Sequence, residues 1–133
     1  MQNAFVWKEE YSIGQPDLDR EHQALFRMAR ELHEAVQRGA GREELAGLFA
    51  RLTGYAKFHF ANEEALMRTA RYAHAASHTA EHRRFAAKVA TLEREFEEGR
   101  SAVTAETMEL LRDWLNRHIL GTDQQVAKHL RVD

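Results

Sequence analysis

The chain has 133 residues, a formal net charge of -2 with basic and acidic residues interspersed, and no cysteine. This length suits a single domain, 1–133, with one hydrophobic core. The charge balance gives no reason to expect a nucleic acid or an anionic membrane as a partner. The lack of cysteine excludes disulfides, thiolate metal sites and a nucleophilic thiol. Since no signal-peptide pattern and no apolar run of ~20 residues is present, we expect a cytoplasmic protein that does not insert into a membrane.

The N-terminal segment 1–17 is predicted to form an arm before the first helix. Trp7, Tyr11 and Ile13 make this segment apolar and aromatic, and Gly14-Gln15-Pro16 interrupts regular structure at its end. Asp17 then stands where the N-cap of a helix is expected. We predict that the arm packs across the helices that follow.

Helical periodicity accounts for most of the remaining chain. Successive patterns run from Leu18 to Arg38, from about Glu43 to Thr69, from about Ala75 to Glu98, and from after Thr104 to Leu120. Short connections between helices of this length imply antiparallel neighbours. The sequence therefore predicts an all-α fold, an up-down-up-down antiparallel four-helix bundle over about 18–120. Gly121 is expected to interrupt the last helix, with Thr122 capping a short C-terminal helix over about 122–131.

Each predicted helix has an inward stripe of apolar residues that is interrupted by histidine or a carboxylate. The interrupting residues are His22, His59, Glu63, His78, His82, His118 and Asp123. An unpaired buried polar group costs roughly 2–7 kcal/mol, and an isolated buried carboxylate costs far more. In an antiparallel bundle all seven would lie at the same end. A bound metal removes the cost, because imidazoles and carboxylates then serve as ligands.

The spacing of these residues suits a shared site. His59 with Glu63, and His78 with His82, are i, i+4 pairs, so each pair lies about 40° apart around its helix. His118 and Asp123 are five residues apart and would diverge by about 140° on a straight α-helix. We expect a local break at Gly121 to turn Asp123 inward.

A single histidine in an apolar stripe is more often a hydrogen-bonded core residue than a metal ligand. Seven inward polar residues at one level argue against that interpretation for the set. The other histidines, His33, His74 and His129, are expected at the surface. Two interpretations of Glu21 remain open: it is either a hydrogen-bonding partner of a ligating histidine or an ordinary surface residue.

Five imidazoles and two carboxylates exceed the needs of one ion and suit two six-coordinate ions that share bridging carboxylates. The absence of thiolates argues against a structural zinc site. Ferritin-like di-iron sites use four carboxylates and two histidines. Fewer anionic ligands stabilise high oxidation states less well, which favours reversible oxygen binding over O–O cleavage.

Several segments of the chain resemble the bacterial hemerythrins. They are Trp7-x3-Tyr11-Ser-Ile-Gly14, Asp19-Arg-Glu-His22, His59-Phe-Ala-Asn-Glu63-Glu-Ala-Leu-Met67, Tyr72 followed by His78-x3-His82-x2-Phe85, and Trp114-Leu-Asn-Arg-His118-Ile-x3-Asp123. The resemblance covers almost the whole chain and fills every ligand position. One departure is Ala73, where relatives often carry proline.

The resemblance implies reversible binding of molecular oxygen at a non-haem di-iron centre, for storage, delivery or sensing. His78, His82 and His118 would hold one iron, and His22 and His59 the other. Glu63 and Asp123 would bridge the two ions together with an oxo or hydroxo group. By position, the apolar residues of the oxygen pocket would be Leu25, Phe60, Trp114, Leu115 and Ile119. An ordinary core role for each of these five remains open.

Two other functions fit the same site. The first is a di-iron enzyme that acts on peroxide or nitric oxide. The second is a signalling module whose liganded state is read by a protein partner, for which the sequence provides no identity. A non-enzymatic oxygen-binding protein is the favoured hypothesis.

Overall fold

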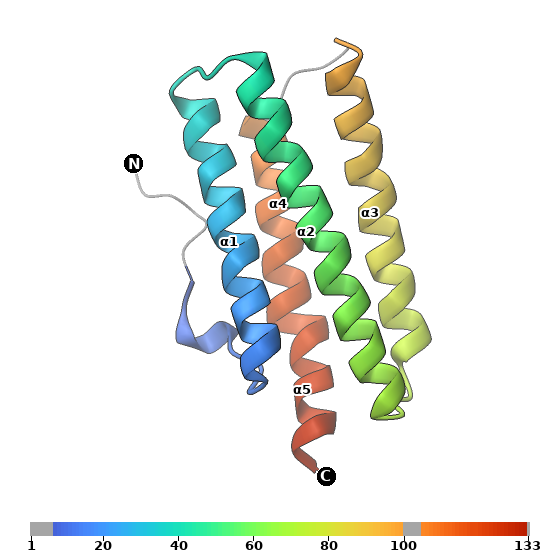
Figure 1. Cartoon of the computed structure of the whole chain (residues 1–133). Coiled ribbons are helices and arrows are strands. Elements are labelled where there is room, and N and C mark those ends of the chain that lie inside the picture. The colour runs from blue at the N-terminus through green and yellow to red at the C-terminus, as the bar shows by residue number, and fades with distance from the viewer. Residues whose placement is uncertain (1–6, 100–104, 133) are drawn as a thin grey trace.

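The computed structural model describes residues 7–99 and 105–132. In chain order the elements are the 3-10 turn η1 (Glu9–Tyr11), the helices α1 (Pro16–Gln37), α2 (Arg42–Thr69), α3 (Ala75–Glu97) and α4 (Ala105–Arg117), the π-helical turn η2 (His118–Thr122) and the helix α5 (Asp123–Val132). The helices α1 to α4 alternate in direction, which confirms the predicted up-down-up-down all-α bundle (Figure 1). No helix among the described residues has the length and apolar character needed to cross a membrane.

The start of α1 differs from the prediction. Gln15 is the N-cap, Pro16 occupies the beginning of the helix, and Asp17 lies in the first turn, so the expected cap at Asp17 is wrong. Proline suits this position because its fixed φ is helical and its missing N–H would have had no helical partner. Asp17 and Asp19 place negative charge in the first turn, where the helix dipole favours it.

The arm is attached to α1 and α5 by side-chain hydrogen bonds. Ser12 donates from its hydroxyl to Oδ2 of Asp19 over 2.6 Å, and the backbone N–H of Ile13 donates to Oδ1 of the same carboxylate over 2.9 Å. Gln124 on α5 donates from Nε2 to the carbonyl oxygen of Ser12 over 3.1 Å. The arm therefore connects the first turn of α1 with the first turn of α5.

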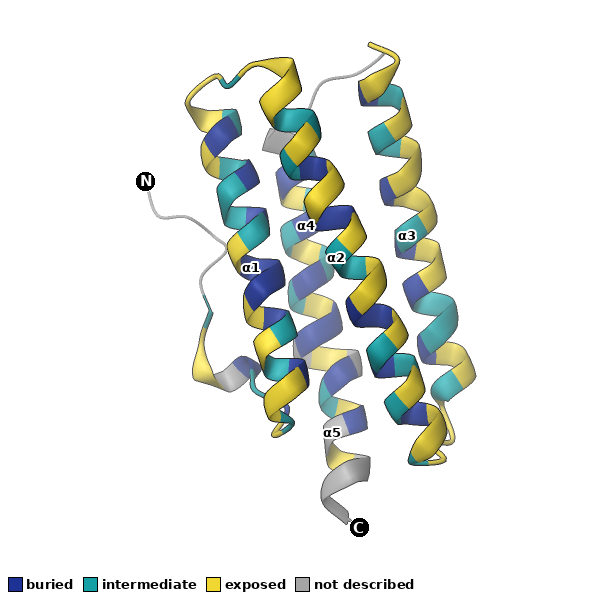
Figure 2. Cartoon of the chain, viewed as in Figure 1, coloured by how far each residue is buried: buried dark blue, intermediate teal, exposed yellow. Residues whose placement is uncertain are grey.

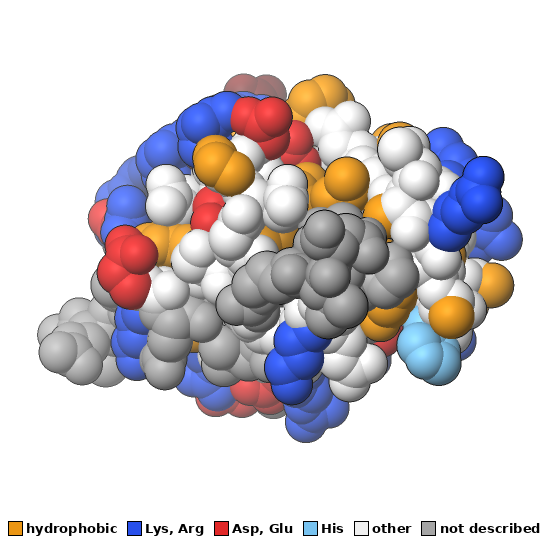
Figure 3. Space-filling model, turned by 90° about the horizontal axis from the view of Figure 1, so that it is seen from below, with side chains coloured by type: hydrophobic (Ala, Val, Ile, Leu, Met, Phe, Trp, Pro, Cys, Tyr) orange, Lys and Arg blue, Asp and Glu red, His pale blue; other side chains and the backbone are white. Residues whose placement is uncertain are grey.

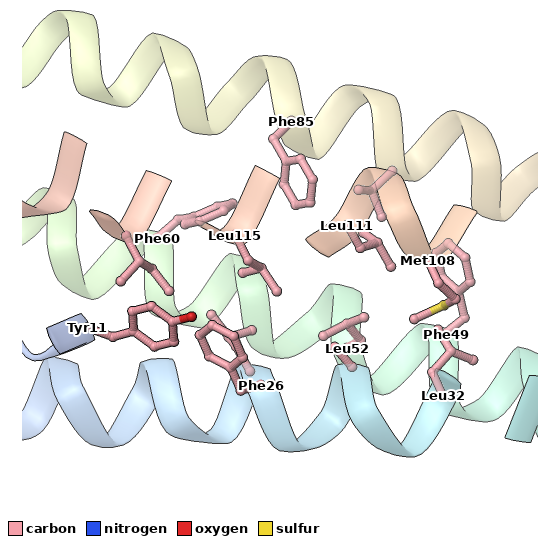
Figure 4. Close-up of a cluster of buried hydrophobic side chains, with 14 of the residues drawn as sticks. Tyr11, Phe26, Leu32, Phe49, Leu52, Phe60, Phe85, Met108, Leu111 and Leu115 are labelled. Carbon is pink, nitrogen blue, oxygen red and sulfur yellow. The ribbon is translucent and has the colours of Figure 1, made fainter. Parts of the chain in front are cut away.

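Aromatic packing holds the same arm against the bundle. Tyr11 stacks on Phe26 of α1, with 5.3 Å between ring centroids and 7° between the planes. Trp7 meets Phe26 edge to face at 6.0 Å. Figure 4 shows Tyr11 and Phe26 beside Leu115 of α4. The described part of the arm, from Trp7 onward, thus packs across the helices, as its aromatic sequence predicts.

The junction of α4 and α5 corrects a second expectation. Gly121 does not break the helix, and Thr122 does not begin a separate one, because both lie within the π-helical turn η2 that leads directly into α5. A π turn closes its hydrogen bonds from residue i to i+5, one residue more than an α-helix. Residues five apart therefore face the same side. The turn brings Asp123 onto the inward face that carries His118.

The inner faces of the helices are buried along their length (Figure 2). Away from the arm the core is apolar, and Leu32, Phe49, Leu52, Met108 and Leu111 meet there (Figure 4). Helical periodicity in the sequence of α2 predicts an inward stripe that includes Leu45 and Leu48 but neither Phe49 nor Met67. In the structure Phe49 and Met67 are buried, whereas Leu45 and Leu48 are half-buried. The reason is that α2 contacts both α1 and α3 and so buries a wider face than one stripe.

Candidate metal centre

Seven polar side chains meet in the half of the bundle nearer the arm and α5. They form two groups whose ligand atoms lie within 4.8 Å of one another: Glu63, His78, His82, His118 and Asp123 in one, and His22, His59, Glu63 and Asp123 in the other. We call these the three-histidine group and the two-histidine group. All seven residues are buried. The structure therefore brings together every residue that the sequence analysis selected as a metal ligand.

Local helix geometry positions most of these side chains. Each i, i+4 pair, His59 with Glu63 on α2 and His78 with His82 on α3, directs both members to one site. His22 comes from the first half of α1. Because α1 and α3 begin at the end where α2 finishes, these residues lie at a common level, as can be followed in Figure 1.

Glu63 lies between the two groups and directs one carboxylate oxygen to each. Its Oε1 is 2.5 Å from Nε2 of His78 and 3.1 Å from Nε2 of His82. Its Oε2 is 3.4 Å from Nε2 of His59 and 3.8 Å from Nε2 of His22. This is the arrangement that a carboxylate needs in order to bridge two metal ions.

Asp123 repeats the arrangement from the opposite side. Its Oδ1 is 2.9 Å from Nε2 of His118 and 3.0 Å from Nε2 of His78, whereas its Oδ2 is 3.1 Å from Nε2 of His22. Both carboxylates are therefore shared, with one oxygen on the three-histidine side and one on the two-histidine side. With the shared carboxylates counted on each side, the first group offers five protein ligands and the second offers four.

The hydrogen bonding of these buried atoms fits a metal. Among the described residues, neither the carboxylate oxygens of Glu63 and Asp123 nor Nε2 of His22 and His59 have a hydrogen-bond partner. Buried polar atoms are rarely left in this state, because desolvation without a hydrogen bond is costly. Nitrogen and oxygen donors without thiolate suit iron and similar divalent ions. The residues present thus fit a pair of such ions.

The same proximity determines the charges in the metal-free protein. Burial lowers the pKa of His22 and of His78, but the nearby carboxylates of Asp123 and Glu63 outweigh it and raise both values to about 9. Burial raises the pKa of Glu63, yet the imidazoles that face its carboxylate, His118 first, bring it well below its ordinary value. Both carboxylates are therefore ionised, and protons compete with any metal for the imidazole nitrogens.

A second layer of carboxylates orients three of the histidines. Glu21 of α1 lies 2.7 Å from Nδ1 of His59. Glu64 of α2 lies 2.8 Å from Nδ1 of His82, and Glu81 of α3 lies 2.8 Å from Nδ1 of His118. Glu21 and Glu64 each come from the helix that precedes that of their histidine, whereas Glu81 of α3 reaches His118 at the start of η2. A carboxylate on Nδ1 leaves Nε2 directed at the metal and raises its basicity.

Of these three carboxylates, Glu21 had two possible roles in the sequence analysis, a partner of a ligating histidine or an ordinary surface residue. The structure places it in contact with His59. Asn62 also donates from Nδ2 to Oε2 of Glu21 over 2.9 Å. Burial raises the pKa of Glu21, but its hydrogen bonds to His59 and Asn62 lower it overall. Sequence reasoning missed Glu64 and Glu81. The available signal was their position, since each directly adjoins a candidate ligand in the sequence.

A small apolar cavity lies beside the cluster. It has a volume of about 20 Å³, and its lining includes Leu25, Phe60, Trp114 and Leu115. A volume of ~10–15 Å³ is enough for one water-sized molecule. These four residues are among the five predicted for the oxygen pocket. The fifth, Ile119, is buried in the same core cluster but does not line the cavity.

Two aromatic rings cover the three-histidine group on the cavity side. Phe60 stacks on His82, with 4.0 Å between centroids and 9° between planes. Trp114 stacks on His118 at 4.3 Å and 13°. Phe85 in turn stacks on Trp114 at 3.9 Å. These stacks fix the imidazole planes and keep water away from them.

The remaining histidines lie outside the cluster. His74, at the turn between α2 and α3, is exposed as expected. His33 is half-buried, so its expected surface position is only partly right. The side chain of His129 falls outside the described residues.

Figure 3 views the bundle end-on, from the end where α1 begins and α5 finishes. Charged side chains lie around the rim of this end.

A family model described as the hemerythrin HHE cation binding domain matches residues 14–130. The chain belongs to the hemerythrin family. Among its curated relatives, the bacteriohemerythrin of Methylococcus capsulatus is 34% identical over 106 residues, which are 80% of each chain. The bacteriohemerythrin of Stenotrophomonas maltophilia is 32% identical over 96% of this chain and 82% of its own length.

Two further matches, one of them a solved structure, also carry the name of this family. Myohemerythrin-1 of Phascolopsis gouldii is 32% identical over 90% of this chain and 88% of its own length. A crystal structure of wild-type hemerythrin superimposes with a TM-score of 0.89 at 31% identity, covering 94% of this chain and 96% of that one. The bundle described above is therefore the hemerythrin fold.

Proposed function

We propose that this chain holds two iron ions and binds molecular oxygen reversibly. The observation that carries the proposal is the division of two buried carboxylates, Glu63 and Asp123, between a three-histidine group and a two-histidine group. Membership of the hemerythrin family supports iron as the metal and oxygen as the ligand. A pair of ferrous ions held by these residues would supply the reversible redox chemistry that oxygen binding requires.

The protein's own residues divide this task. His78, His82 and His118 would complete one metal site, whereas His22 and His59 provide one protein ligand fewer for the other. If an oxo or hydroxo group were shared by both ions as a further ligand, the first ion would have six ligands and the second five, so only the second would keep an open position. We propose that oxygen takes this position, next to the cavity lined by Leu25 and Leu115.

The cavity suits reversible binding because it offers no acid or base. Among its lining residues that the structure describes, the one hydroxyl is that of Thr53, which donates to the carbonyl oxygen of Phe49 over 2.9 Å. Irreversible breakdown of reduced oxygen requires proton delivery, and a dry apolar surrounding withholds protons. The same property argues against an enzyme that consumes peroxide.

The deciding experiment is anaerobic loading with ferrous iron, a count of iron per chain, and titration with oxygen. We expect two irons per chain, one oxygen bound per pair, and full recovery after repeated removal of oxygen under argon. Fewer than two irons per chain would reject the proposed centre. Sustained turnover of peroxide or nitric oxide, with poor recovery between oxygen cycles, would instead identify a di-iron enzyme.

A further inference from the structure

A groove lies on the outside of the bundle, between α3 and α4. Its volume is about 260 Å³, and it is lined by Glu81, Arg84, Phe85, Lys88, Leu110, Trp114 and Arg117. It differs from the apolar cavity in being open to solvent and rich in positive charge. It shares Trp114 and Phe85 with that cavity, so the same aromatic pair lines both spaces.

The positive charges of the groove are not neutralised within the described part of the chain. Arg84, Lys88 and Arg117 are exposed, and none forms an ion pair with a described acidic residue. Elsewhere on the surface arginines do find such partners, as Arg51 does with Glu31 over 3.5 Å. The one acidic residue of the lining, Glu81, directs its Oε1 to His118. The groove therefore presents an excess of positive charge to an approaching molecule.

Two contacts connect this groove with the candidate metal centre. The Trp114 ring, which is half-buried and lines the groove, stacks on the imidazole of His118 at 4.3 Å. Glu81 lines the same groove and lies 2.8 Å from Nδ1 of His118. A molecule in the groove is thus separated from a metal ligand by one aromatic ring or one carboxylate.

We propose that the groove is a docking surface for an acidic electron-transfer protein that restores oxidised iron to the ferrous state. This inference rests on the proposed di-iron function, because a reductant is needed only if the chain holds iron that becomes oxidised. Reduction of two ferric ions to two ferrous ions takes two electrons, and the partner loses the same number in successive one-electron encounters. The Trp114–His118 stack is the short path between donor and metal.

Charge complementarity is the argument for a protein partner of this kind. Complementary charges chiefly accelerate association and orient the encounter, which is what a transient electron donor requires. Such encounters also use small interfaces, so a groove of this size with a charged rim is sufficient. Arg84 and Lys88 on α3 together with Arg117 on α4 span both walls of the groove and present the positive surface that an acidic partner would meet.

The docking itself is testable without iron. Zinc-loaded full-length chain is titrated with oxidised flavodoxin, an acidic electron-transfer protein, while the indole N–H signals of Trp7 and Trp114 are followed by NMR. We expect the Trp114 signal to shift and the Trp7 signal to stay, since only Trp114 lines the groove. The shift should disappear in the double variant Arg84→Glu, Lys88→Glu. A shift that persists in that variant, or an unmoved Trp114 signal, overturns the proposal.

A control variant separates local from overall charge. Lys57→Glu with Arg68→Glu changes the net charge equally, but both residues are exposed on α2 and neither lines the groove. Reduction of the oxidised iron-loaded chain by reduced flavodoxin should fall at least about tenfold at low salt in the groove variant and little in the control. The cationic reductant methyl viologen radical should not be slowed by the groove variant. Equal losses in both variants would overturn the docking surface.

The two proposals fail separately. If the chain takes up two irons and binds oxygen reversibly but flavodoxin leaves Trp114 unperturbed, the docking surface is rejected and the proposed function stands. If flavodoxin docks at the groove and iron does not bind, the proposed function is rejected instead.

Discussion

Glu64 of α2 places its Oε2 2.8 Å from Nδ1 of His82 on α3, although the sequence pattern of α2 marks Glu63, not Glu64, as the inward carboxylate. The two adjacent residues therefore have different tasks. Glu63 lies in the cluster itself, whereas Glu64 holds a histidine of the neighbouring helix from outside. The contact fixes which nitrogen of His82 is directed inward.

We predict that Glu64→Gln lowers metal affinity by ~10–100-fold, because a neutral amide makes a weaker hydrogen bond to Nδ1 of His82 than a carboxylate does and orients the ring less firmly. Competition with a coloured chelator measures the affinity. The matched control is Glu43→Gln, an exposed position on the same helix. Equal affinities in the Glu64 variant and the parent chain would show that the contact does not tune the metal.

Replacing His118 with alanine should abolish full metal loading. His118 contacts both Glu63 and Asp123, at 3.5 Å and 2.9 Å, so its loss affects both shared carboxylates. We expect fewer than two irons per chain and a lower melting temperature, since ligand linkage at 100 times Kd contributes about 2.7 kcal/mol. Elemental analysis and calorimetry provide the measurements. His74→Ala, at an exposed position, should behave like the parent; retention of two irons in the His118 variant would contradict the assignment.

Leu115 lines the apolar cavity, and a pair of nearly isosteric variants tests its role. Leu115→Thr introduces a hydroxyl and Leu115→Val does not, while both remove similar volume. We predict that autoxidation of the oxygenated protein is ~10-fold or more faster in the threonine variant than in the valine variant, because the hydroxyl can deliver a proton. Iron content should be unchanged in both. Identical decay of the oxygenated spectrum in the two variants would remove Leu115 from the pocket.

Asp19 should be more important for stability than its half-buried position suggests. Its carboxylate accepts hydrogen bonds from Ser12 and from the backbone of Ile13, which hold the arm in place. We expect Asp19→Ala to lower the free energy of unfolding by about 1–2 kcal/mol. Asp17→Ala, which removes an exposed ion pair with Arg20 and a favourable negative charge in the first turn of α1, should cost less, about 0.5 kcal/mol. Urea unfolding of both variants makes the comparison, and equal losses would contradict the role of the arm.

Metal uptake should release protons, and the number should fall at high pH. The pKa of His22 and of His78 is raised from 6.5 to about 9 in the metal-free protein, so both are protonated at neutral pH. The stability that these pairs contribute without metal is complete below pH 6.5 and is lost as the pH rises through about 9. Zinc affinity should therefore increase with pH up to that value.

Proton release is measured by adding zinc to the metal-free chain in weak buffer at neutral pH and again above pH 9. We expect clear acidification in the first case and much less in the second. Equal release at both values would show that the two imidazoles are not protonated in the metal-free fold. The same titration performed on His118→Ala separates the contribution of the three-histidine group.

The sequence by itself determined the helices, their alternating direction and the residues that meet in the cluster. The i, i+4 spacing of His59 with Glu63 and of His78 with His82 is a local property of the α-helix, so it can be read from the chain alone. Burying polar residues in otherwise apolar stripes also costs free energy unless they are paired, which indicates a bound metal. Short connections then place all of them at one end of the bundle.

Only the tertiary structure decided how the seven clustered side chains divide into a three-histidine group and a two-histidine group. The inward position of Asp123 depends on a π turn, where a break at Gly121 had been expected, and the assignment of each Glu63 and Asp123 oxygen depends on distances between helices. Glu64 and Glu81 reach histidines 18 and 37 residues away in the sequence. The physical reason is that periodicity specifies which face of a helix is buried, whereas the angle and depth at which helices pack specify which atoms touch.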